Sequence, residues 1–302
     1  MRFAYLTTAY HEPVHLHRLQ RSLALGDPES VRFIQFDVSS PQAGRARETD
    51  AIVRYTRRGI TWGDGSYLDE LLGSLAALRD FDWDWLFLLS GQDYPVRPLA
   101  ELHAEIERSD AIAFSSLSAS ATSAHDGDRS PITRYFYRYA SPQQSWPTWA
   151  RKASLITAKR IEPLIGERVR LQPRPRAAGP AVGFRKTAVP FSTERPCYQG
   201  SEYVAMSRTA VEALLDFVHA EPALVQHLRH TFIPTEAFFT TGLRWLFGND
   251  VVDVSLHYMR YGGNANPRLL GAADCDDISK SQRYFARKFT DDSSWVEEAF
   301  PQ

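Results

Sequence analysis

The sequence predicts a mainly parallel α/β sheet, and three observations support that prediction. Over the first 116 residues, segments typical of strands alternate with segments of helical periodicity in the order β-α-β-β-α-β-α-β. WLFLLS (85–90) is apolar at five of its six positions, as in a strand buried on both faces of a parallel sheet. No internal repeat or linker divides the 302 residues, so we expect a single domain over 1–302.

The remaining elements follow from residue patterns. Stretches rich in β-branched and aromatic residues predict strands, and leucines at helical spacing predict helices. We expect strands at 3–10, 31–38, 52–56, 111–116, 202–207 and 251–256, and helices at 14–25, 66–79, 99–108, 210–218 and 236–245. Ser66 is expected to cap the second of these helices. Residues 117–196 carry clusters of Ser, Pro and Arg together with an aromatic run, and we expect them to be irregular.

Composition excludes several classes of protein. The chain has 35 Lys and Arg against 36 Asp and Glu, which argues against a dedicated nucleic-acid binder. Two cysteines cannot form a disulfide framework, and no apolar run approaches the roughly 18–20 residues of a membrane span. Residues 151–186 nevertheless hold ten basic and two acidic residues, a net charge of +8. We favour a solvated surface insertion there; the alternative is a patch facing an anionic acceptor or membrane headgroups.

Several well-known motifs are absent, among them the GxxxxGK[ST] phosphate loop, a GxGxxG after a strand, the GxSxG elbow and HExxH. His11, His15 and His17 lie close in sequence, but we do not expect them to share a face and bind a metal. Asp82 and Asp84 precede the 85–90 strand, and we interpret them as its polar entry. Ligands of parallel sheets bind beyond the carboxyl ends of strands, where Asp37 and the stretch Ser90–Asp93 lie.

Four motifs occur together. They are ITWGDGSYLDELL (60–72), FLLSGQDYPVRP (87–98), CYQGSEYVAMSRTAV (197–211) with FIPTEAFFTTGL (232–243), and RYFARKF (283–289). Their order and spacing resemble the core-2/I-branching β-1,6-N-acetylglucosaminyltransferase and peptide O-xylosyltransferase family over residues 2–292, except 117–196. The resemblance implies a GT-A fold in a bacterial member. It also implies a nucleotide-binding half (1–116), a variable basic insertion (117–196) and an acceptor-binding, catalytic half (197–302).

The resemblance also assigns roles to residues. Glu236 matches the catalytic base, and Phe238 and Phe239 are expected to form an apolar wall beside it; the alternative is a Glu that stabilises a helix N-terminus. Arg287 and Lys288 match the basic pair on the donor's diphosphate; the alternative is an exposed surface pair. The other residues implied are Asp37 for the nucleoside, Asp93 for the donor sugar or loop positioning, Trp62 and Gly63 near both sugars, and Gly200, Ser201 and Glu202 on the acceptor side.

The implied activity is an inverting, metal-independent transfer of a sugar, GlcNAc or xylose, from a UDP-sugar to a hydroxyl of a glycan acceptor. No cofactor or metal ligand is expected beyond the donor itself. The alternative is a non-catalytic module that binds a nucleotide sugar or glycan on the same fold. A third hypothesis is that residues 151–186 bind a membrane surface or nucleic acid. By resemblance we expect a cytoplasmic enzyme, peripheral at the inner membrane face, acting on a polysaccharide or lipid-linked glycan without a nucleic-acid partner.

Overall fold

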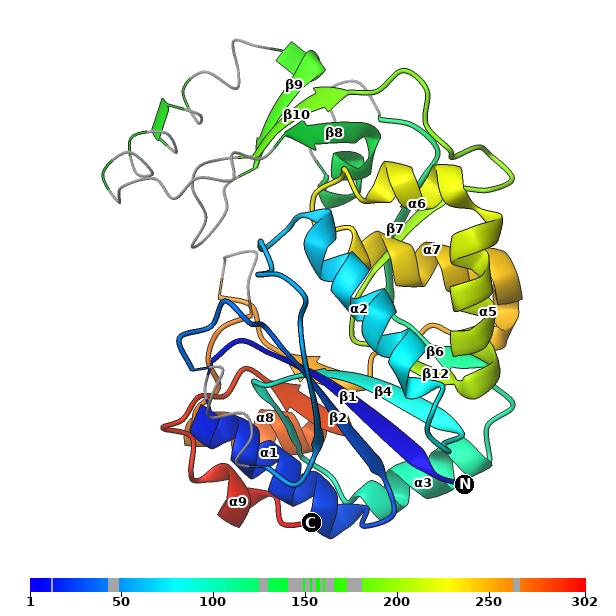
Figure 1. Cartoon of the computed structure of the whole chain (residues 1–302). Coiled ribbons are helices and arrows are strands. Elements are labelled where there is room, and N and C mark those ends of the chain that lie inside the picture. The colour runs from blue at the N-terminus through cyan, green and yellow to red at the C-terminus, as the bar shows by residue number, and fades with distance from the viewer. Residues whose placement is uncertain are drawn as a thin grey trace.

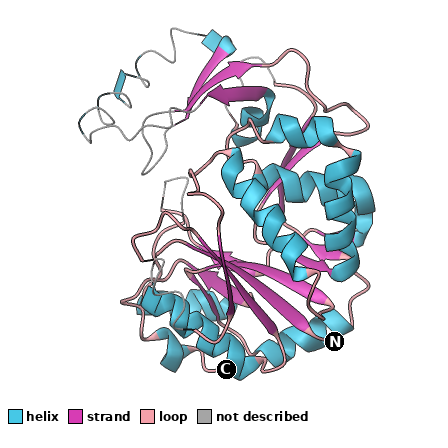
Figure 2. Ribbon diagram, viewed as in Figure 1, coloured by secondary structure: helices cyan, strands magenta, loops and turns pink. Residues whose placement is uncertain are grey.

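The computed structural model describes residues 1–11, 13–42, 49–124, 130–140, 166–172, 181–262 and 267–302, with isolated positions between 149 and 160. Figures 1 and 2 show a large sheet covered by helices, and a smaller group of strands at the opposite end of the molecule. None of the helices in these ranges is long and apolar enough to cross a membrane.

The large sheet has seven strands in the order β13-β6-β12-β4-β1-β2-β3. These are β1 (Phe3–Ala9), β2 (Val31–Phe36), β3 (Ile52–Tyr55), β4 (Trp85–Ser90), β6 (Ala113–Phe114), β12 (Ala205–Ser207) and β13 (Val251–Val252). Strand β1 pairs in parallel with β2 and β4, and only β12 runs antiparallel to its neighbours. All six residues of β4 are buried. The predicted parallel α/β sheet is therefore confirmed, and β4 has the predicted bounds.

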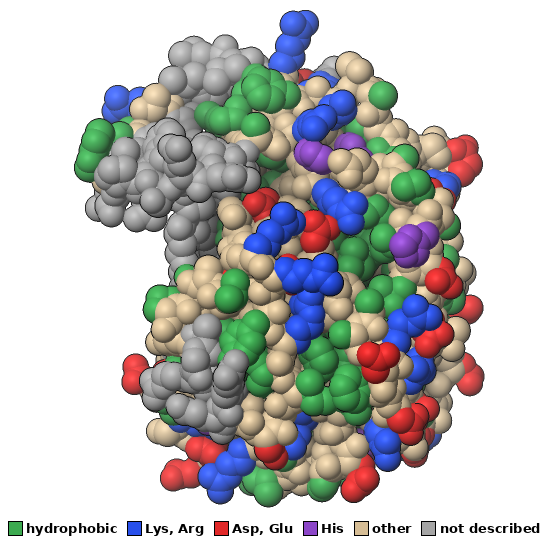
Figure 3. Space-filling view, viewed as in Figure 1, with side chains coloured by type: hydrophobic (Ala, Val, Ile, Leu, Met, Phe, Trp, Pro, Cys, Tyr) green, Lys and Arg blue, Asp and Glu red, His purple; other side chains and the backbone are tan. Residues whose placement is uncertain are grey.

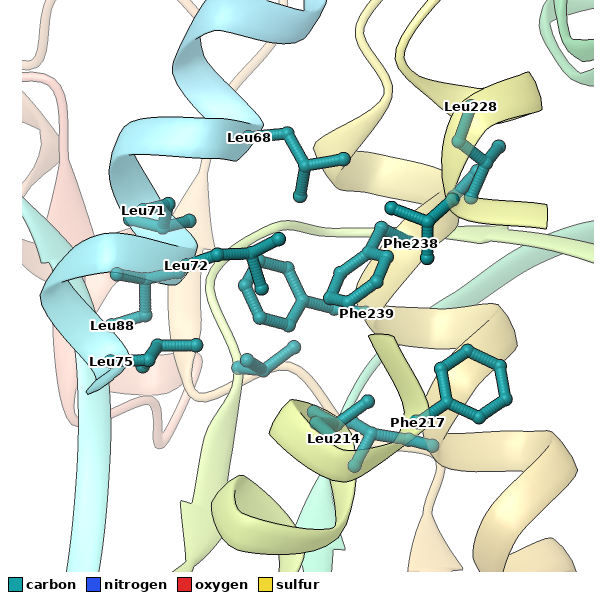
Figure 4. Packing of buried hydrophobic residues seen from close by; sticks show 14 of the residues in the cluster. Leu68, Leu71, Leu72, Leu75, Leu88, Leu214, Phe217, Leu228, Phe238 and Phe239 are labelled. Carbon is teal, nitrogen blue, oxygen red and sulfur yellow. The ribbon is translucent and has the colours of Figure 1, made fainter. Parts of the chain in front are cut away.

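Helices cover both faces of this sheet, because alternate residues of its strands pack into two separate cores. On one face, Phe3 and Phe87 pack with α1 (Pro13–Gly26) and α3 (Leu99–Glu107). On the other, Leu88 packs with α2 (Gly65–Leu78), α5 (Arg208–Ala220), α6 (Pro222–Leu228) and α7 (Thr235–Phe247). Figure 4 shows Phe238 and Phe239 of α7 inside this second core, among leucines of α2.

The start of α2 differs from the prediction. Asp64, not Ser66, is the N-cap, and its carboxylate accepts a hydrogen bond from the Ser66 backbone N–H (2.8 Å). The Ser66 hydroxyl instead accepts a hydrogen bond from the Thr61 backbone N–H (3.0 Å). Asp and Ser are comparable caps, so the choice between two nearby candidates depends on the incoming loop.

The prediction that residues 117–196 are irregular is wrong for much of the described part. Strand β7 (Leu117–Ala121) pairs with β11 (Cys197–Gly200), and a 3₁₀ helix, η2 (Pro131–Phe136), follows β7. A further sheet has the order β8-β10-β9, formed by β8 (Tyr137–Ala140), β9 (Val169–Gln172) and β10 (Ala181–Arg185). The aromatic run lies inside the fold, with Tyr135 and Phe136 almost fully buried.

A last sheet brings the C-terminal motif to the end of the large sheet. Its order is β14-β15-β5, formed by β5 (Asp93–Pro95), β14 (His257–Met259) and β15 (Phe285–Arg287). The antiparallel register of β5 and β15 places Arg287 opposite Asp93. The strands predicted at 202–207 and 251–256 are shorter than expected, reduced to β12 and β13. Helices α8 (Cys275–Lys280) and α9 (Val296–Ala299) complete the C-terminal region.

Candidate active site

A cluster of polar side chains lies at the carboxyl ends of β1 and β4. The Thr8 hydroxyl of β1 lies 3.1 Å from the Tyr67 hydroxyl of α2. Burial raises the pKa of Tyr67, and the charge of Glu202 raises it further. The charges of Arg287 and Asp93 also act on this phenol, so side chains from five separate segments converge at this edge of the sheet.

Asp93 is the fully buried centre of this cluster. Its Oδ2 accepts a hydrogen bond from the Ser90 backbone N–H (2.8 Å) and lies 3.3 Å from His257 Nε2. Its Oδ1 lies 3.4 Å from Arg287 Nε. Burial alone would raise the pKa of Asp93, but Arg287 and His257 outweigh burial and hold it below its ordinary value. Asp93 therefore stays ionised and holds Arg287 in place.

The guanidinium of Arg287 is buried, but not all of its N–H groups form hydrogen bonds with described residues. Only 7% of its side chain is exposed, and its guanidinium carbon lies 4.0 Å above the Tyr203 ring. Its Nε and Nη1 atoms have no hydrogen-bond partner among the described residues. Because buried donors without acceptors are costly, this guanidinium is suited to an anionic ligand. Lys288 follows it directly and is half-buried, with its backbone carbonyl hydrogen-bonded to Leu270 N (2.9 Å).

Glu236 lies in the first turn of α7, and 30% of its side chain is exposed. Its Oε2 accepts hydrogen bonds from Arg134 Nη2 and from Gln199 Nε2 (3.3 Å for the latter). The predicted apolar wall is wrong, because Phe238 and Phe239 pack into the core (Figure 4). The immediate neighbours of the carboxylate are a cation and an amide.

Glu202 is a second carboxylate beside Glu236. Its Oε2 accepts a hydrogen bond from the Thr235 hydroxyl (2.7 Å), and Thr235 directly precedes Glu236. Burial raises the pKa of Glu202 to about 7; Glu236 and Asp93 act in the same direction, against the hydrogen bond from Thr235 and the charge of Arg287. Two carboxylates with different surroundings thus share the N-terminal end of α7.

Gly200 and Ser201 shape the loop that carries Glu202. A Cβ on Gly200 would lie 2.0 Å from the Ser116 carbonyl oxygen and 2.4 Å from Thr240 Oγ1, so only glycine fits there. The Ser201 backbone N–H donates to the Ser116 hydroxyl (3.3 Å). Both residues therefore fix the path of the chain between β11 and β12.

Trp62 and Gly63 border the same region. Gly63 has a φ of +83°, and its carbonyl accepts a hydrogen bond from Ile233 N (2.9 Å). The Trp62 ring meets Phe232 edge-on, with centroids 5.4 Å apart, and 41% of Trp62 is exposed. The contact places an exposed indole beside the segment that leads to Glu236. Such a surface is suited to packing against a sugar ring.

Asp37 directly follows β2, and β1 lies between β2 and β4. It is buried, and its carboxylate accepts hydrogen bonds from Ser39 N (2.9 Å) and Ile60 N (3.2 Å). In the described part of the chain it fixes a loop, and no contact joins it to the cluster around Asp93. The nucleoside role of Asp37 stays a prediction.

Within the described ranges, no group of three or more His, Cys, Asp or Glu side chains could hold a metal ion. His15 is fully buried, and its Nε2 lies 3.0 Å from the Asp93 carbonyl oxygen. Burial lowers the pKa of His15 to about 4, so it is a neutral support of the Asp93 loop. Asp82 and Asp84 both bind Arg2, which confirms their role at the entry of β4.

Several residues of this site were not predicted from the sequence, namely Tyr67, Arg134, Gln199, Tyr203, Thr235 and His257. Tyr67, Gln199, Tyr203 and Thr235 stand inside the four motifs, and adjacency to Gly200, Glu202 and Glu236 was a usable signal for the last three. Arg134 gave none, because it lies in the stretch predicted to be irregular.

The model of the Core-2/I-Branching enzyme family matches residues 3–279. No curated protein sequence matches the chain. Among solved structures, S. aureus TarS residues 1–349 match with 15% identity and a TM-score of 0.30, over 48% of this chain and 42% of that fragment. Glucosyl-3-phosphoglycerate synthase from Mycobacterium tuberculosis matches with 12% identity and a TM-score of 0.32, over 74% of this chain and 66% of the synthase chain.

The chain thus spans less than half of the matched TarS fragment, and TM-scores of this size carry no argument about function. The family match, by contrast, covers most of the chain. It includes the strands of the large sheet, helix α7, and both Glu202 and Glu236. With the observed α/β architecture it confirms the GT-A class. The chain belongs to the Core-2/I-branching enzyme family.

Proposed function

We propose that this protein transfers a sugar from a UDP-sugar to a hydroxyl of a glycan acceptor, with inversion and without a metal. Family membership supports the coarser part, a glycosyltransferase with a nucleotide-sugar donor and a glycan acceptor. One observation carries the finer part: Arg287 forms a buried ion pair with ionised Asp93, while its Nε and Nη1 have no hydrogen-bond partner among the described residues.

Arg287 and Lys288 suit the leaving group. When the bond between the anomeric carbon and the diphosphate breaks, its electron pair moves onto the diphosphate oxygen. Fixed positive charge at that oxygen stabilises the transition state. Arg287 needs no reorganisation for this task, because Asp93 and Tyr203 already hold its guanidinium.

Glu236 suits the role of general base. Its contacts in the described part of the chain involve Oε2 alone, which leaves Oε1 for an acceptor hydroxyl. In the proposed step Oε1 takes the hydroxyl proton while the acceptor oxygen attacks the anomeric carbon from the face opposite the diphosphate. Arg134 and Gln199 orient the carboxylate, and exposed Trp62 packs against a sugar.

The acidic residue beyond β4 also supports a mechanism without metal. Asp93 is fully buried, Arg287 neutralises its charge, and its Oδ2 lies 3.3 Å from His257 Nε2. A divalent cation there would have to displace both groups. In our proposal Arg287 and Lys288 therefore perform the charge stabilisation that a metal would otherwise supply.

The donor sugar, GlcNAc or xylose, and the polysaccharide or lipid-linked acceptor stay predictions from resemblance. So do the bacterial source, the cytoplasmic location and the peripheral membrane contact through 151–186. Most of that segment lies outside the described residues.

The test is the Glu236→Gln variant in a transfer assay with UDP-GlcNAc and UDP-xylose. We expect transfer to fall by about 10²–10⁴-fold, the usual contribution of a general base, with UDP affinity retained. Glu212→Gln is the matched control, because Glu212 forms an exposed pair with Arg208 on α5. Unchanged transfer in Glu236→Gln would refute the assignment. Donor binding without transfer by the unmodified protein would favour the non-catalytic module.

A further inference from the structure

A second pocket lies between α6 and the segment that follows β10, with a cavity volume of about 400 Å³. Four basic side chains line it: Arg138, Lys186, His227 and His230. The rest of the lining is Gln226 and small apolar residues, with no acidic side chain. None of the lining residues belongs to the active site described above. Figure 3 shows Lys, Arg and His side chains gathered on this upper part of the molecule.

The positive charges of this pocket are not neutralised locally. Within the described ranges, neither Arg138 nor Lys186 forms an ion pair. Burial lowers the pKa of His227, and Lys186 and His230 lower it further. The basic groups are thus close enough to repel one another, and an anion between them would relieve that repulsion.

The two histidines present defined hydrogen-bonding atoms. His227 Nε2 lies 2.7 Å from the Tyr135 carbonyl oxygen and therefore carries the proton. His230 Nδ1 lies 2.9 Å from the Gln226 carbonyl oxygen, which leaves its Nε2 without a contact among the described residues. Each imidazole keeps one nitrogen that becomes a further donor when the ring is protonated.

We propose that this pocket binds an oxyanion of the phosphate class, carried by a free phosphate ester or by a phospholipid headgroup. Arg138 offers a planar fork and Lys186 a point charge, the two usual side chains for phosphate. They come from β8 and from the residue after β10, and they line the pocket together with His227 of α6 and with His230, which follows α6. The volume exceeds that of phosphate alone and lies in the range of small-molecule sites, roughly 300–1,000 Å³. The apolar side of the pocket therefore has room for a small organic body.

The pocket also shares a support with the active site. His227 holds the Tyr135 carbonyl, and the Lys186 backbone N–H donates to the Phe136 carbonyl (2.9 Å). Both carbonyls belong to η2, which carries Arg134, the ion-pair partner of Glu236. The same 3₁₀ helix, η2, thus contacts the proposed anion site and carries the residue that pairs with Glu236, the candidate base.

The test is a calorimetric titration of the full chain with inorganic phosphate and with glycerol 3-phosphate, at constant ionic strength and with UDP in excess. A parallel sedimentation assay compares phosphatidylglycerol vesicles with phosphatidylcholine vesicles. The pocket variant is Arg138→Gln with Lys186→Gln. We expect the affinity of this variant for the phosphate ligands to fall about tenfold or more, since it loses two charged hydrogen-bond donors. Retained UDP affinity and an unchanged melting temperature would show that its fold and donor site are intact.

The matched control is Arg108→Gln with Lys280→Gln, which removes the same two residue types from exposed positions outside the pocket. Binding of inorganic phosphate, of glycerol 3-phosphate or of the anionic vesicles would support the proposal if it is lost in the pocket variant and kept in the control. Which ligand binds would identify the source of the phosphate. Binding of neither ligand, or an equal loss in both double variants, would overturn it. No activity is measured, so this result stands apart from that of the transfer assay.

Discussion

Asp93 Oδ1 lies 3.4 Å from Arg287 Nε, and the two side chains are 0% and 7% exposed. The pair joins the SGQDYP motif to the FARKF motif through the antiparallel pairing of β5 with β15. A buried carboxylate just beyond the end of central strand β4 is therefore the fixed counter-ion of the cation that we assign to the diphosphate.

We predict that Asp93→Asn weakens both the fold and donor binding. Removing one member of a buried ion pair leaves an uncompensated charge, and we expect a loss of about 3–5 kcal/mol in the free energy of unfolding. UDP affinity, measured by calorimetry, should fall at least about tenfold, because Arg287 loses its anchor. Asp82→Asn is the control, because Asp82 pairs with Arg2 at the surface with 86% of its side chain exposed. Equal stability and UDP affinity in the two variants would contradict this role of Asp93.

The ionisation of Glu202 should control donor affinity near neutral pH. Its pKa is raised to about 7, so the carboxylate becomes charged as pH rises through 7, close to Arg287. Because the diphosphate of a UDP-sugar is fully ionised throughout, its affinity should fall about tenfold between pH 6 and pH 8. Glu202→Gln should bind the donor equally at both pH values. An unchanged pH dependence in that variant would rule out Glu202 as the titrating group.

His15 should make the fold sensitive to acid. Its pKa is lowered from 6.5 to about 4 by burial, so the unfolded chain binds the proton more tightly than the folded one. The contribution is complete above pH 6.5 and is lost as pH falls toward 4, by about 3 kcal/mol in total. Denaturant unfolding of His15→Gln should show a shallower decline over this range than the unmodified protein. His219→Gln, at an exposed position on α5, should keep the original slope.

Gly200→Ala should destabilise the chain, because the new methyl group would overlap the Ser116 carbonyl oxygen at 2.0 Å. We expect a loss of at least about 1–3 kcal/mol, the usual cost of overpacking, with a lower melting temperature. Gly271→Ala is the control, since nothing lies within 4 Å of a Cβ there. A melting temperature of Gly200→Ala equal to that of the control would show that the loop relaxes freely.

The large sheet could be predicted because its signals are local. Strand β4 is a continuous apolar run that ends at Ser90 and Gly91, and the alternation of strands with helices specifies parallel pairing. The sheet of β5, β14 and β15 could not be predicted, because strands of three residues carry no period and form only through tertiary pairing. The same holds for β8, β9 and β10, which have four or five residues each.

The site shows the same division. Glu236, Arg287 and Asp93 could be named from their motifs, but the contacts that pair Arg134 with Glu236 and Asp93 with Arg287 could not. Arg134 reaches Glu236 from η2, and Asp93 reaches Arg287 from the opposite strand. Such contacts depend on how distant segments pack, which a single sequence does not contain. The prediction of an apolar wall beside Glu236 was wrong for that reason. Phe238 and Phe239 pack into the core instead.

In the proposed mechanism Arg287 and Lys288 hold the donor's diphosphate without a metal. The most direct measurement is the calorimetric affinity of the unmodified protein for UDP in excess EDTA and again with Mn²⁺. We expect the same affinity in both conditions, within a factor of about two. Binding that disappears in EDTA and returns with Mn²⁺ would contradict it.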